Sequence, residues 1–218
     1  MKGLFLTFEG PDGSGKTTQM KRLASRLAAR GVEVVATREP GGTAVGDRLR
    51  EIVLSPAYAE MKDETEILLY AASRAQHVRE IIAPALERGA VVICDRFVDA
   101  SMAYQAYGLG VSPDEVASIN RFATGGLQPR RTYLLDVPVE VSRERLLARA
   151  GAAGGSALDR IEQKETGYHE RVREGFLLIA RAEPGRVKLL DANRPVEDIA
   201  EEIESDCERL LEERLGEK

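Results

Sequence analysis

The stretch Gly10-Pro11-Asp12-Gly13-Ser14-Gly15-Lys16-Thr17 directly follows the apolar run Leu4-Phe5-Leu6-Thr7-Phe8. A Gly-x-x-x-x-Gly-Lys-[Ser/Thr] segment between a strand and a helix forms a loop whose backbone N–H groups converge on anionic oxygens. The lysine and the hydroxyl of such a loop are positioned for phosphates and for Mg²⁺. The stretch therefore predicts a phosphate-binding loop for a nucleoside triphosphate.

The sequence around this loop favours that interpretation over a glycine turn that binds nothing. Residues 4–8 are typical of a short buried strand. Residues 17–30 are typical of a helix, because apolar residues recur along one stripe of it. That stripe contains Met20, Leu23, Ala24, Leu27 and Ala28. Strand, glycine loop and helix thus follow one another in the order that phosphate binding needs.

The size and charge of the chain limit its class. With 218 residues, of which 43% are hydrophobic, the chain can bury a sizeable core, and we expect one domain over residues 1–218. A formal net charge of −5 argues against a protein that coats nucleic acid, since that function usually needs a basic surface. No apolar run approaches the roughly 18 residues of a membrane span, and no basic leader precedes the first strand. We therefore expect a cytoplasmic protein with neither a nucleic acid nor a membrane as partner.

Short apolar runs recur along the chain and are separated by helical patterns. Continuously apolar strands that alternate with helices are typical of a parallel sheet covered on both faces. We therefore predict an α/β fold, a three-layer α/β/α sandwich around a five-stranded parallel sheet. Ligands are expected at the carboxyl ends of its strands. The expected strands are residues 4–8, 32–36, 90–94, 132–135 and 187–190.

Capping signals mark several expected helix starts. Ser112 precedes Pro113, and Glu115 follows three residues after the serine, which is the pattern of an N-cap, a first-turn proline and a box-closing glutamate. Asp63 and Glu66 have the same spacing. We expect helices to begin at both places.

One segment breaks the alternating pattern. The run Ala150-Gly151-Ala152-Ala153-Gly154-Gly155-Ser156-Ala157 has few side chains able to anchor it, and Arg149 and Arg160 flank it. Its composition alone fits a plain solvent loop as well as a hinge or flap. Beside a triphosphate loop, a mobile segment bounded by arginines is better interpreted as a small lid that closes over charge, at approximately residues 149–160.

Two blocks of residues bring charge to the ends of the second and third strands. Thr37-Arg38-Glu39-Pro40-Gly41-Gly42-Thr43 contains a turn that lets the backbone approach a ligand, and Arg50 follows in the next helix. Taken alone, an ordinary strand-to-helix turn explains this block better. In Asp95-Arg96-Phe97, Asp95 could hold Mg²⁺ through water and the planar fork of Arg96 suits a phosphate. A structural ion pair explains this block equally well, until the phosphate loop beside it is considered.

A helix face carries a third candidate group. Glu66, Tyr70 and Arg74 are four residues apart, so their side chains share one face. An aromatic ring next to a guanidinium can stack on a base and hydrogen-bond its edge. The alternative is that Tyr70 belongs to the core and Arg74 to the surface. Asp159 and Glu162 have the spacing of a capping box, with or without a further role.

The remaining reactive side chains receive no role from the sequence. His77 and His169 lie on expected helices without partners in view. Cys94 and Cys207 give neither a disulfide framework nor metal-ligand spacing, so we expect reduced, structural thiols.

Together these residues resemble the bacterial type of thymidylate kinase, a family of P-loop nucleoside monophosphate kinases. Many NTPases share the phosphate loop, but the Arg-Glu-Pro-Gly-Gly-Thr block combined with the Asp-Arg block is highly specific. The matching segments run in family order over nearly the whole chain. They are Phe8-Glu9-Gly10-Pro11-Asp12-Gly13-Ser14-Gly15-Lys16-Thr17-Thr18-Gln19, Thr37-Arg38-Glu39-Pro40-Gly41-Gly42-Thr43, Leu68-Leu69-Tyr70-Ala71-Ala72-Ser73-Arg74, Asp95-Arg96-Phe97 with Ser101 and Ala103-Tyr104-Gln105, and Asp159-Arg160-Ile161-Glu162.

The resemblance implies ATP-dependent phosphorylation of dTMP to dTDP by a homodimer, with ATP and Mg²⁺ as cofactors. Thr17 would bind Mg²⁺ beside Asp95. The loop would hold the ATP phosphates through residues Gly10, Pro11, Asp12, Gly13, Ser14, Gly15, Lys16, Thr17 and Thr18.

The resemblance also implies how the acceptor nucleotide is held. Asp12 would accept a hydrogen bond from the 3′-hydroxyl, and Arg50 and Arg96 would grip the 5′-phosphate. Tyr104 would crowd the 2′ position of the sugar and so disfavour ribonucleotides. At the base, Tyr70 would stack on thymine, and the polar edge would face the side chains Arg74, Ser101 and Gln105.

Catalysis in this family needs an arginine, from the phosphate loop or from the lid, to stabilise the transferring phosphoryl group. The loop positions here are Gly13 and Ser14, so the resemblance implies that Arg149, Arg160 or both supply this charge, together with Lys16 and Arg96. Two rival functions stay open: a kinase of the same architecture for another nucleotide or a nucleoside, and a nucleotide-dependent switch.

Overall fold

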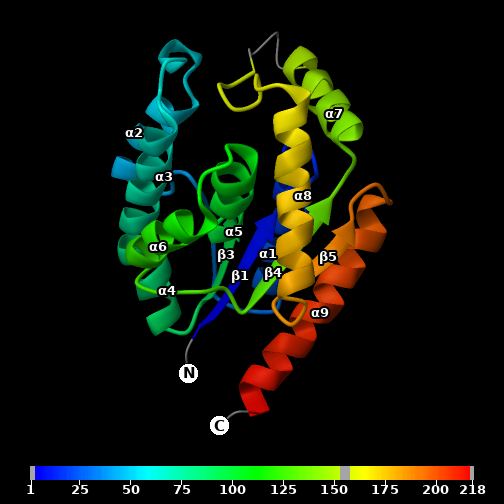
Figure 1. Ribbon diagram of the computed structural model, residues 1–218. Helices are drawn as coiled ribbons and strands as arrows, with labels where there is room; N and C mark the ends of the chain where they lie inside the picture. The colour runs from blue at the N-terminus through cyan, green and yellow to red at the C-terminus, as the bar shows by residue number, and fades with distance from the viewer. Residues whose placement is uncertain (1–2, 153–157, 217–218) are drawn as a thin grey trace.

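The computed structural model describes residues 3–152 and 158–216, which form a parallel sheet with helices on both of its faces (Figure 1). The segment predicted as a lid is described only in part, because residues 153–157 lie outside these ranges. The strands are β1 (Leu4–Glu9), β2 (Val34–Arg38), β3 (Val91–Asp95), β4 (Arg131–Asp136) and β5 (Val187–Asp191). The helices are α1 (Lys16–Ala29), α2 (Ala44–Leu54), η1 (Pro56–Tyr58), α3 (Asp63–His77), η2 (Val78–Ile82), α4 (Ala83–Glu87), α5 (Val98–Ser101), η3 (Met102–Gly108), α6 (Pro113–Thr124), α7 (Val139–Ala152), α8 (Thr166–Ala182) and α9 (Val196–Gly216).

The sheet has the order β2-β3-β1-β4-β5, and each neighbouring pair of strands is parallel. Phe8 of β1 and Arg38 of β2 both lie opposite Asp95 of β3, so the carboxyl ends of these strands lie at the same end of the sheet. That end is at the top in Figure 1. The predicted α/β fold with a five-stranded parallel sheet is confirmed, and the phosphate loop leaves the sheet from its central strand.

Helices cover both faces of the sheet, which explains why its inner strands are continuously apolar. On one face, Leu6 of β1 belongs to a buried cluster with Leu23 of α1 and Ile203 of α9. On the other face, Phe5 packs in a cluster with Val78 of η2. Burying one such side chain fully contributes about 1.5–3 kcal/mol. The two clusters fix the strand ends that carry the site.

The apolar stripe predicted on helix α1 is narrower than expected. Met20, Leu23 and Leu27 are buried, Ala24 is half-buried, and Ala28 is exposed. Because successive helical residues are rotated by about 100°, Ala28 lies well to one side of Leu27. The prediction was therefore wrong for Ala28, although it was right for the helix.

Two of the predicted capping patterns differ in the structure. The N-cap of α3 is Lys62, and Asp63 is the first helical residue. Glu66 does not close a capping box; its buried side chain instead accepts a hydrogen bond from Arg160 at 2.8 Å. Ser112 is the N-cap of α6, but its side chain makes no capping hydrogen bond. A tertiary ion pair with Arg160 has replaced the local contact of Glu66.

The predicted capping box at Asp159 is present without a helix of its own. The Asp159 carboxylate accepts from the backbone N–H groups of Ile161 and Glu162 at 2.9 and 2.8 Å. The Glu162 carboxylate accepts in return from the Asp159 N–H at 3.0 Å. The segment 158–164 is a series of turns that precedes α8. The box therefore fixes a turn at the C-terminal end of the predicted lid.

Two long helices contain π-helical segments. Helix α3 continues through η2 into α4, and α5 continues into η3. Such segments are frequent at functional sites, because one extra residue per turn changes where the side chains point. Tyr104 and Gln105 belong to η3. Within the described ranges, no helix is both long and apolar enough to cross a bilayer.

Candidate active site

The phosphate loop connects β1 with α1 and depends on glycine for its shape. Gly10 has φ 130° and Gly13 has φ 76°, in the region that side chains disfavour. A Cβ at Gly13 would also lie 2.7 Å from the carbonyl oxygen of Ser142 in α7. Helix α7 supports the loop further, because Arg145 donates to the Gly13 carbonyl at 3.3 Å. The sequence motif therefore forms the expected loop, held from the side by α7.

Lys16, the motif lysine, is buried at the start of α1. Its ammonium group donates to the carbonyl oxygens of Gly10 and Pro11 at 3.1 and 2.8 Å. Burial and the nearby Arg96 lower the pKa of Lys16 to about 8. An anion bound at the loop would favour the charged form of this lysine.

Thr17 and Asp95, the two residues predicted to serve Mg²⁺, contact each other. The Thr17 hydroxyl donates to Oδ2 of Asp95 at 2.7 Å, across a separation of 78 residues. Hydroxyl, carboxylate and water oxygens are the ligands that Mg²⁺ prefers in proteins. This donor set fits a magnesium ion next to the phosphate loop.

An open cavity lies beside the loop, and Asp12 of the loop lines it. Its walls come from the phosphate loop, the loops that follow β2 and β3, the helices α2, α3, α5 and η3, and the turn at Asp159 and Ile161. All eight residues predicted to bind the acceptor line it. They are Asp12, Arg50, Tyr70, Arg74, Arg96, Ser101, Tyr104 and Gln105.

Arg96 joins this cavity to the phosphate loop. Its guanidinium donates to the Gly10 carbonyl at 3.1 Å, to Asp12 Oδ1 at 2.7 Å and to the Tyr104 hydroxyl at 3.0 Å. Tyr104 donates in turn to Asp12 Oδ2 at 3.0 Å. Burial acts to raise the pKa of Asp12, but Arg96 and Lys16 hold it well below its usual range. Asp12 is therefore negatively charged and already forms an ion pair with Arg96.

The backbone of Arg96 is strained. Its φ of 72° is the only positive value among the non-glycine residues that the structure describes. Such a conformation costs of the order of 1–3 kcal/mol and persists where the surroundings impose it. Here the buried carboxyl of Glu9 accepts the N–H of Phe97, the next residue, at 2.7 Å. Glu9 thereby fixes the peptide unit that directs Arg96 into the cavity.

Glu9 itself has an unusual environment. Burial and the nearby Asp99 raise the pKa of Glu9 to about 8. Its second oxygen, Oε2, has no hydrogen-bond partner among the described residues. A pKa raised in this way favours the neutral acid at neutral pH. No sequence pattern indicated this shift, because a glutamate beside a phosphate loop is expected to be ionised.

Arg74 also lines the cavity and is buried, so the alternative of a surface arginine is wrong. Its Nε donates to Glu39 Oε2 at 2.7 Å and its Nη2 to the Phe97 carbonyl at 2.9 Å. Its Nη1 donates to Ser101 Oγ at 2.8 Å and also to Asn120 Oδ1. A guanidinium has five N–H donors, and the described residues take four of them. One N–H of Nη2 is left for a ligand in the cavity.

The two arginines that flank the predicted lid lie in different environments. Arg160 is buried and donates to the Val53 carbonyl at 2.9 Å and to Glu66 at 2.8 Å. Glu66 also accepts from Gln105 at 3.1 Å. Arg149 has 66% of its side chain exposed and pairs with Glu162 at 2.8 Å. Arg149 is thus free to change its partner, whereas Arg160 holds a structural pair beneath the cavity.

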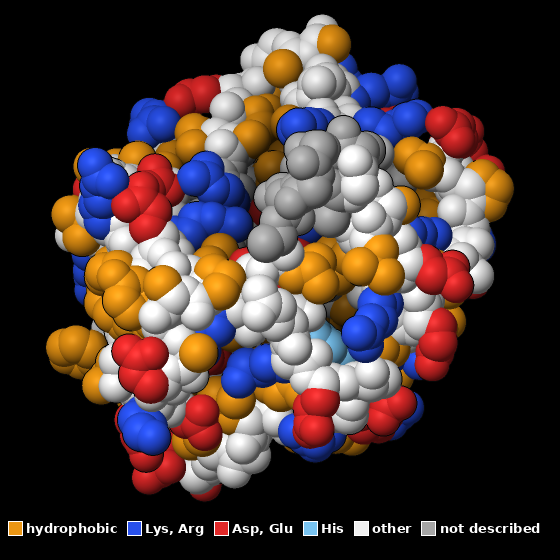
Figure 2. All heavy atoms as spheres, turned by 90° about the horizontal axis from the view of Figure 1, so that it is seen from above, with side chains coloured by type: hydrophobic (Ala, Val, Ile, Leu, Met, Phe, Trp, Pro, Cys, Tyr) orange, Lys and Arg blue, Asp and Glu red, His pale blue; other side chains and the backbone are white. Residues whose placement is uncertain are grey.

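A wider cleft of about 1,320 Å³ adjoins the cavity and opens to solvent. Thr17, Asp95 and Arg149 line it, together with Arg38 of β2. Arg50 lines both spaces and donates to the Pro40 carbonyl at 3.1 Å. Viewed toward this end of the sheet, Figure 2 shows groups of Lys and Arg side chains among hydrophobic and acidic ones. The positive charge is local, as expected for a pocket and not for a surface that coats a polyanion.

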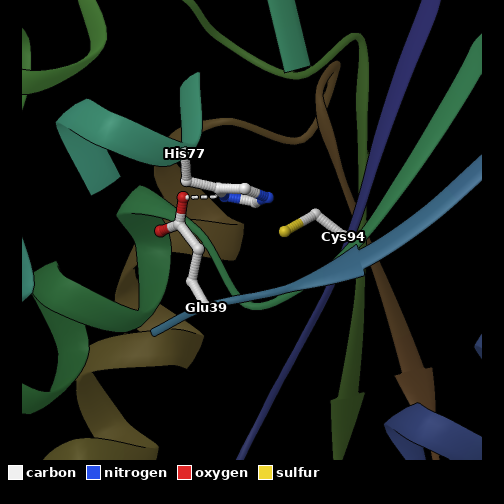
Figure 3. Close-up of side chains that lie close together, drawn as sticks. All are labelled: Glu39, His77 and Cys94. Atoms are coloured by element: carbon white, nitrogen blue, oxygen red, sulfur yellow. Dashed lines mark hydrogen bonds and ion pairs between the residues drawn. The ribbon is translucent and has the colours of Figure 1, made fainter. Parts of the chain in front are cut away.

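Glu39, His77 and Cys94 point toward one another below the cavity, with one ligand atom of each within 4.8 Å of the others (Figure 3). A metal would need a thiolate and a free ring nitrogen. Burial raises the pKa of Cys94 well above its usual range, and the thiol donates to the Arg96 carbonyl at 3.0 Å. Both ring nitrogens of His77 are hydrogen-bonded. The three residues form a hydrogen-bonded cluster and not a metal site.

Sequence reasoning missed the second layer of the site. Glu39 and Asn120 contact Arg74 directly, His77 contacts Glu39, and Glu9 holds the peptide that follows Arg96; none of the four was given a role. One signal was available for His77: it follows Arg74 by three residues and so lies on the helix face that carries Glu66, Tyr70 and Arg74. No comparable signal pointed to Asn120, which reaches Arg74 from a different helix, α6.

Comparison with known proteins agrees with this geometry. The family model described as thymidylate kinase matches residues 8–203 of the chain. A thymidylate kinase from Exiguobacterium sibiricum is 52% identical over 214 residues, which make up 98% of each chain. One from Pseudomonas fluorescens is 48% identical over 216 residues, or 99% of this chain and 100% of the relative. The chain therefore belongs to the thymidylate kinase family.

Proposed function

We propose that this protein transfers the γ-phosphoryl group of ATP to dTMP and forms dTDP. The observation that carries the proposal is that all eight residues predicted to bind the acceptor line one cavity beside the phosphate loop. A donor held by the loop and an acceptor held in the cavity would meet at Arg96, which contacts both the loop and the cavity wall. Holding two reactants in this way supplies much of the catalysis of phosphoryl transfer.

The acceptor would lie with its phosphate toward Arg96 and Arg50 and its base toward Arg74. Tyr70 is half-buried at the cavity wall, where its ring can stack on the base. Tyr104 is fixed by Arg96 and Asp12, so its ring cannot move aside for a 2′-hydroxyl. This arrangement supports a deoxynucleotide over a ribonucleotide as the acceptor.

The transfer itself needs no general base, because the attacking phosphate oxygen is already ionised. The protein's task is to neutralise the charge that develops on the transferred group. Lys16 and Arg96 supply fixed positive charge at the loop. Arg149 supplies the third positive charge. Its guanidinium is exposed and is held by an ion pair with Glu162, which it can exchange for the transferred group. Bound Mg²⁺, next to Thr17 and Asp95, adds charge on the donor phosphates.

The finer parts of the proposal concern assembly and place. We propose a homodimer, since Leu68 of α3 is 56% exposed beside an open apolar groove between α3 and α6. We propose that the protein works in the cytoplasm, where ATP and deoxynucleotides are found. Sedimentation of the purified protein tests the first statement.

The experiment that tests the activity is a panel of acceptors with ATP and Mg²⁺. ADP formation is measured with dTMP, dUMP, dGMP and thymidine. We expect dTMP to be the best acceptor and dUMP the next, because a single methyl contact is worth only about 1–3 kcal/mol. A protein that binds ATP but forms no ADP with any acceptor would instead be a nucleotide-dependent switch, and the proposal would be wrong.

A further inference from the structure

His77, at the end of α3, is fully buried and makes two hydrogen bonds to the end of β2 and the loop that follows. Its Nδ1 lies 2.8 Å from Glu39 Oε1 (Figure 3). Its Nε2 lies 2.7 Å from the Thr37 hydroxyl. A carboxylate accepts hydrogen bonds and cannot donate them, so Nδ1 carries a proton. In the neutral ring, Nε2 then accepts from Thr37. The two contacts allow one orientation of the ring.

The space around this histidine is restricted by the Pro-Gly-Gly turn. Gly42 has φ 83°, and a Cβ on it would lie 2.7 Å from the Thr37 hydroxyl and 2.9 Å from His77 Nε2. No larger residue fits there without breaking the hydrogen bond between them. The turn therefore has a purpose besides approach to a ligand: it leaves room for the His77 ring.

Glu39 connects His77 to the cavity. One of its oxygens accepts from His77 and the other from Nε of Arg74 at 2.7 Å. Bonds to both oxygens fix the plane of the carboxylate, and that plane orients the fork of the guanidinium. Both members of the Glu39–Arg74 pair are almost wholly buried. Water is therefore not at hand to replace the contact from His77.

We propose that His77 is a positioning residue for recognition of the acceptor base. By fixing Glu39, it fixes Arg74, whose last available N–H would reach a polar atom on the edge of the base. His77 touches neither nucleotide and takes no part in the transfer. This inference rests on the proposed function, since it assigns the base end of the cavity to the acceptor.

The test separates the two hydrogen bonds of His77 with two variants of similar size. The side-chain amide of asparagine lies where Nδ1 was, so His77→Asn keeps a donor for Glu39. The amide of glutamine lies where Nε2 was, so His77→Gln keeps the contact to Thr37 and loses the one to Glu39. His169→Gln, at the other histidine of the chain, is the matched control. Circular dichroism and thermal unfolding show whether each variant is folded.

For His77→Gln we expect the KM for dTMP to rise about tenfold, with kcat and the KM for ATP within twofold of the wild type. Thymidine, which has the base but no phosphate, should lose the same factor as a competitive inhibitor. His77→Asn should restore both constants to within about threefold, and His169→Gln should change neither. A structural role alone would affect both His77 variants alike, or lower kcat as well, and either result would overturn the proposal.

Nitrogen NMR of the wild-type protein gives a second test that depends on no variant. The ring signals of His77 should show a protonated Nδ1, and an unprotonated Nδ1 would refute the inference whatever the variants do. If the wild type fails to phosphorylate dTMP, the proposed function fails. If it does so but the Asn and Gln variants behave alike, only the role of His77 fails.

Discussion

The phosphate end and the base end of the acceptor cavity both depend on an arginine, but they hold it in different ways. Arg96, at the phosphate end, contacts Asp12, Tyr104 and a loop carbonyl, all of which belong to the cavity or the loop. Arg74, at the base end, contacts buried groups on four separate segments and retains one N–H. If the acceptor binds as proposed, its phosphate takes Arg96 from Asp12, whereas its base meets an Arg74 that is already fixed.

The glutamates behind these arginines differ in the same way. Glu39 has both oxygens bonded to buried cationic or donor groups, so its place in the structure requires a carboxylate. Glu9 has one oxygen on a backbone N–H and one without a partner, and its pKa is raised to about 8. Glu39 and Glu9 are both buried, but the surroundings of Glu39 favour a charged carboxylate and those of Glu9 favour a neutral acid. The partners decide, because burying a charge is costly unless another charge compensates for it.

The largest effect should follow from removing the arginine of the phosphate end. Arg96→Ala should lower kcat about 10³-fold or more, because it deletes charge that the transferred phosphoryl group needs. Inhibition by thymidine should stay within twofold, since thymidine has no phosphate for Arg96 to bind. Steady-state kinetics measure both. Arg48→Ala, at an exposed arginine that pairs only with Glu51, is the control and should behave as wild type. Turnover near normal in Arg96→Ala would remove the phosphate end from the mechanism.

The next largest effect should follow from removing Arg149, the exposed arginine at the predicted lid. Arg149→Ala should lower kcat by about 10²-fold, below the full loss of an arginine finger, because Lys16 and Arg96 remain. Its thermal stability should not change, since an exposed pair contributes about 0–1 kcal/mol. Arg160→Ala should have the reverse effect, with kcat nearly unchanged and a lower melting temperature. The variant leaves Glu66 buried without its charged partner. Equal kinetic losses in both folded variants would show that the division of roles between the two arginines is wrong.

Neutralising Glu39, behind the arginine of the base end, should lower the stability of the protein more than neutralising Glu9, behind the arginine of the phosphate end. Glu39→Gln leaves the Arg74 charge buried without a counter-charge, which costs about 3–5 kcal/mol and lowers the melting temperature by roughly 10 °C. Glu9→Gln has the shape of the neutral acid and should melt within about 3 °C of the wild type at pH 7. Differential scanning calorimetry of the two variants measures the contrast. Equal losses would mean that the two glutamates carry the same charge.

The sequence predicted the fold and the inner layer of the site because both depend on local patterns. Apolar runs placed each strand within two residues of its observed bounds, and the motif residues fixed the ends of β1 and β3. The spacing of Glu66, Tyr70 and Arg74 correctly gave one shared helix face. Such patterns follow from periodicity and from the chain's own connections.

The outer layer could not be predicted, because its contacts are long-range and depend on burial. Asn120 meets Arg74 across 46 residues and Glu39 meets His77 across 38. Glu66 read locally as part of a capping box, yet in the folded chain it pairs with Arg160 across 94 residues. The raised pKa of Glu9 follows from its burial and from the nearby Asp99, and its Oε2 has no partner among the described residues. None of these facts is encoded in a spacing.

The smallest effect, and the one that tests the charge of Glu9 most directly, is a dependence of stability on pH. In the unfolded chain the pKa of Glu9 is near 4.5, and in the folded protein it is about 8. Between these values the folded state holds one proton more than the unfolded state, so the free energy of unfolding falls as the pH rises. One proton changes it by at most about 1.4 kcal/mol per pH unit. This contribution is fully present below pH 4.5 and is lost as the pH passes 8.

Glu9→Gln cannot titrate and should lack this contribution, so the difference between the two proteins isolates it from every other titrating group. Urea unfolding at pH 5, 6, 7 and 8 should show the wild type losing stability relative to Glu9→Gln by about 1 kcal/mol per pH unit. A difference that stays constant over this range would mean that Glu9 is ionised in the folded protein. In that case the phosphate end would be held by a carboxylate, as the base end is, and the contrast between them would disappear.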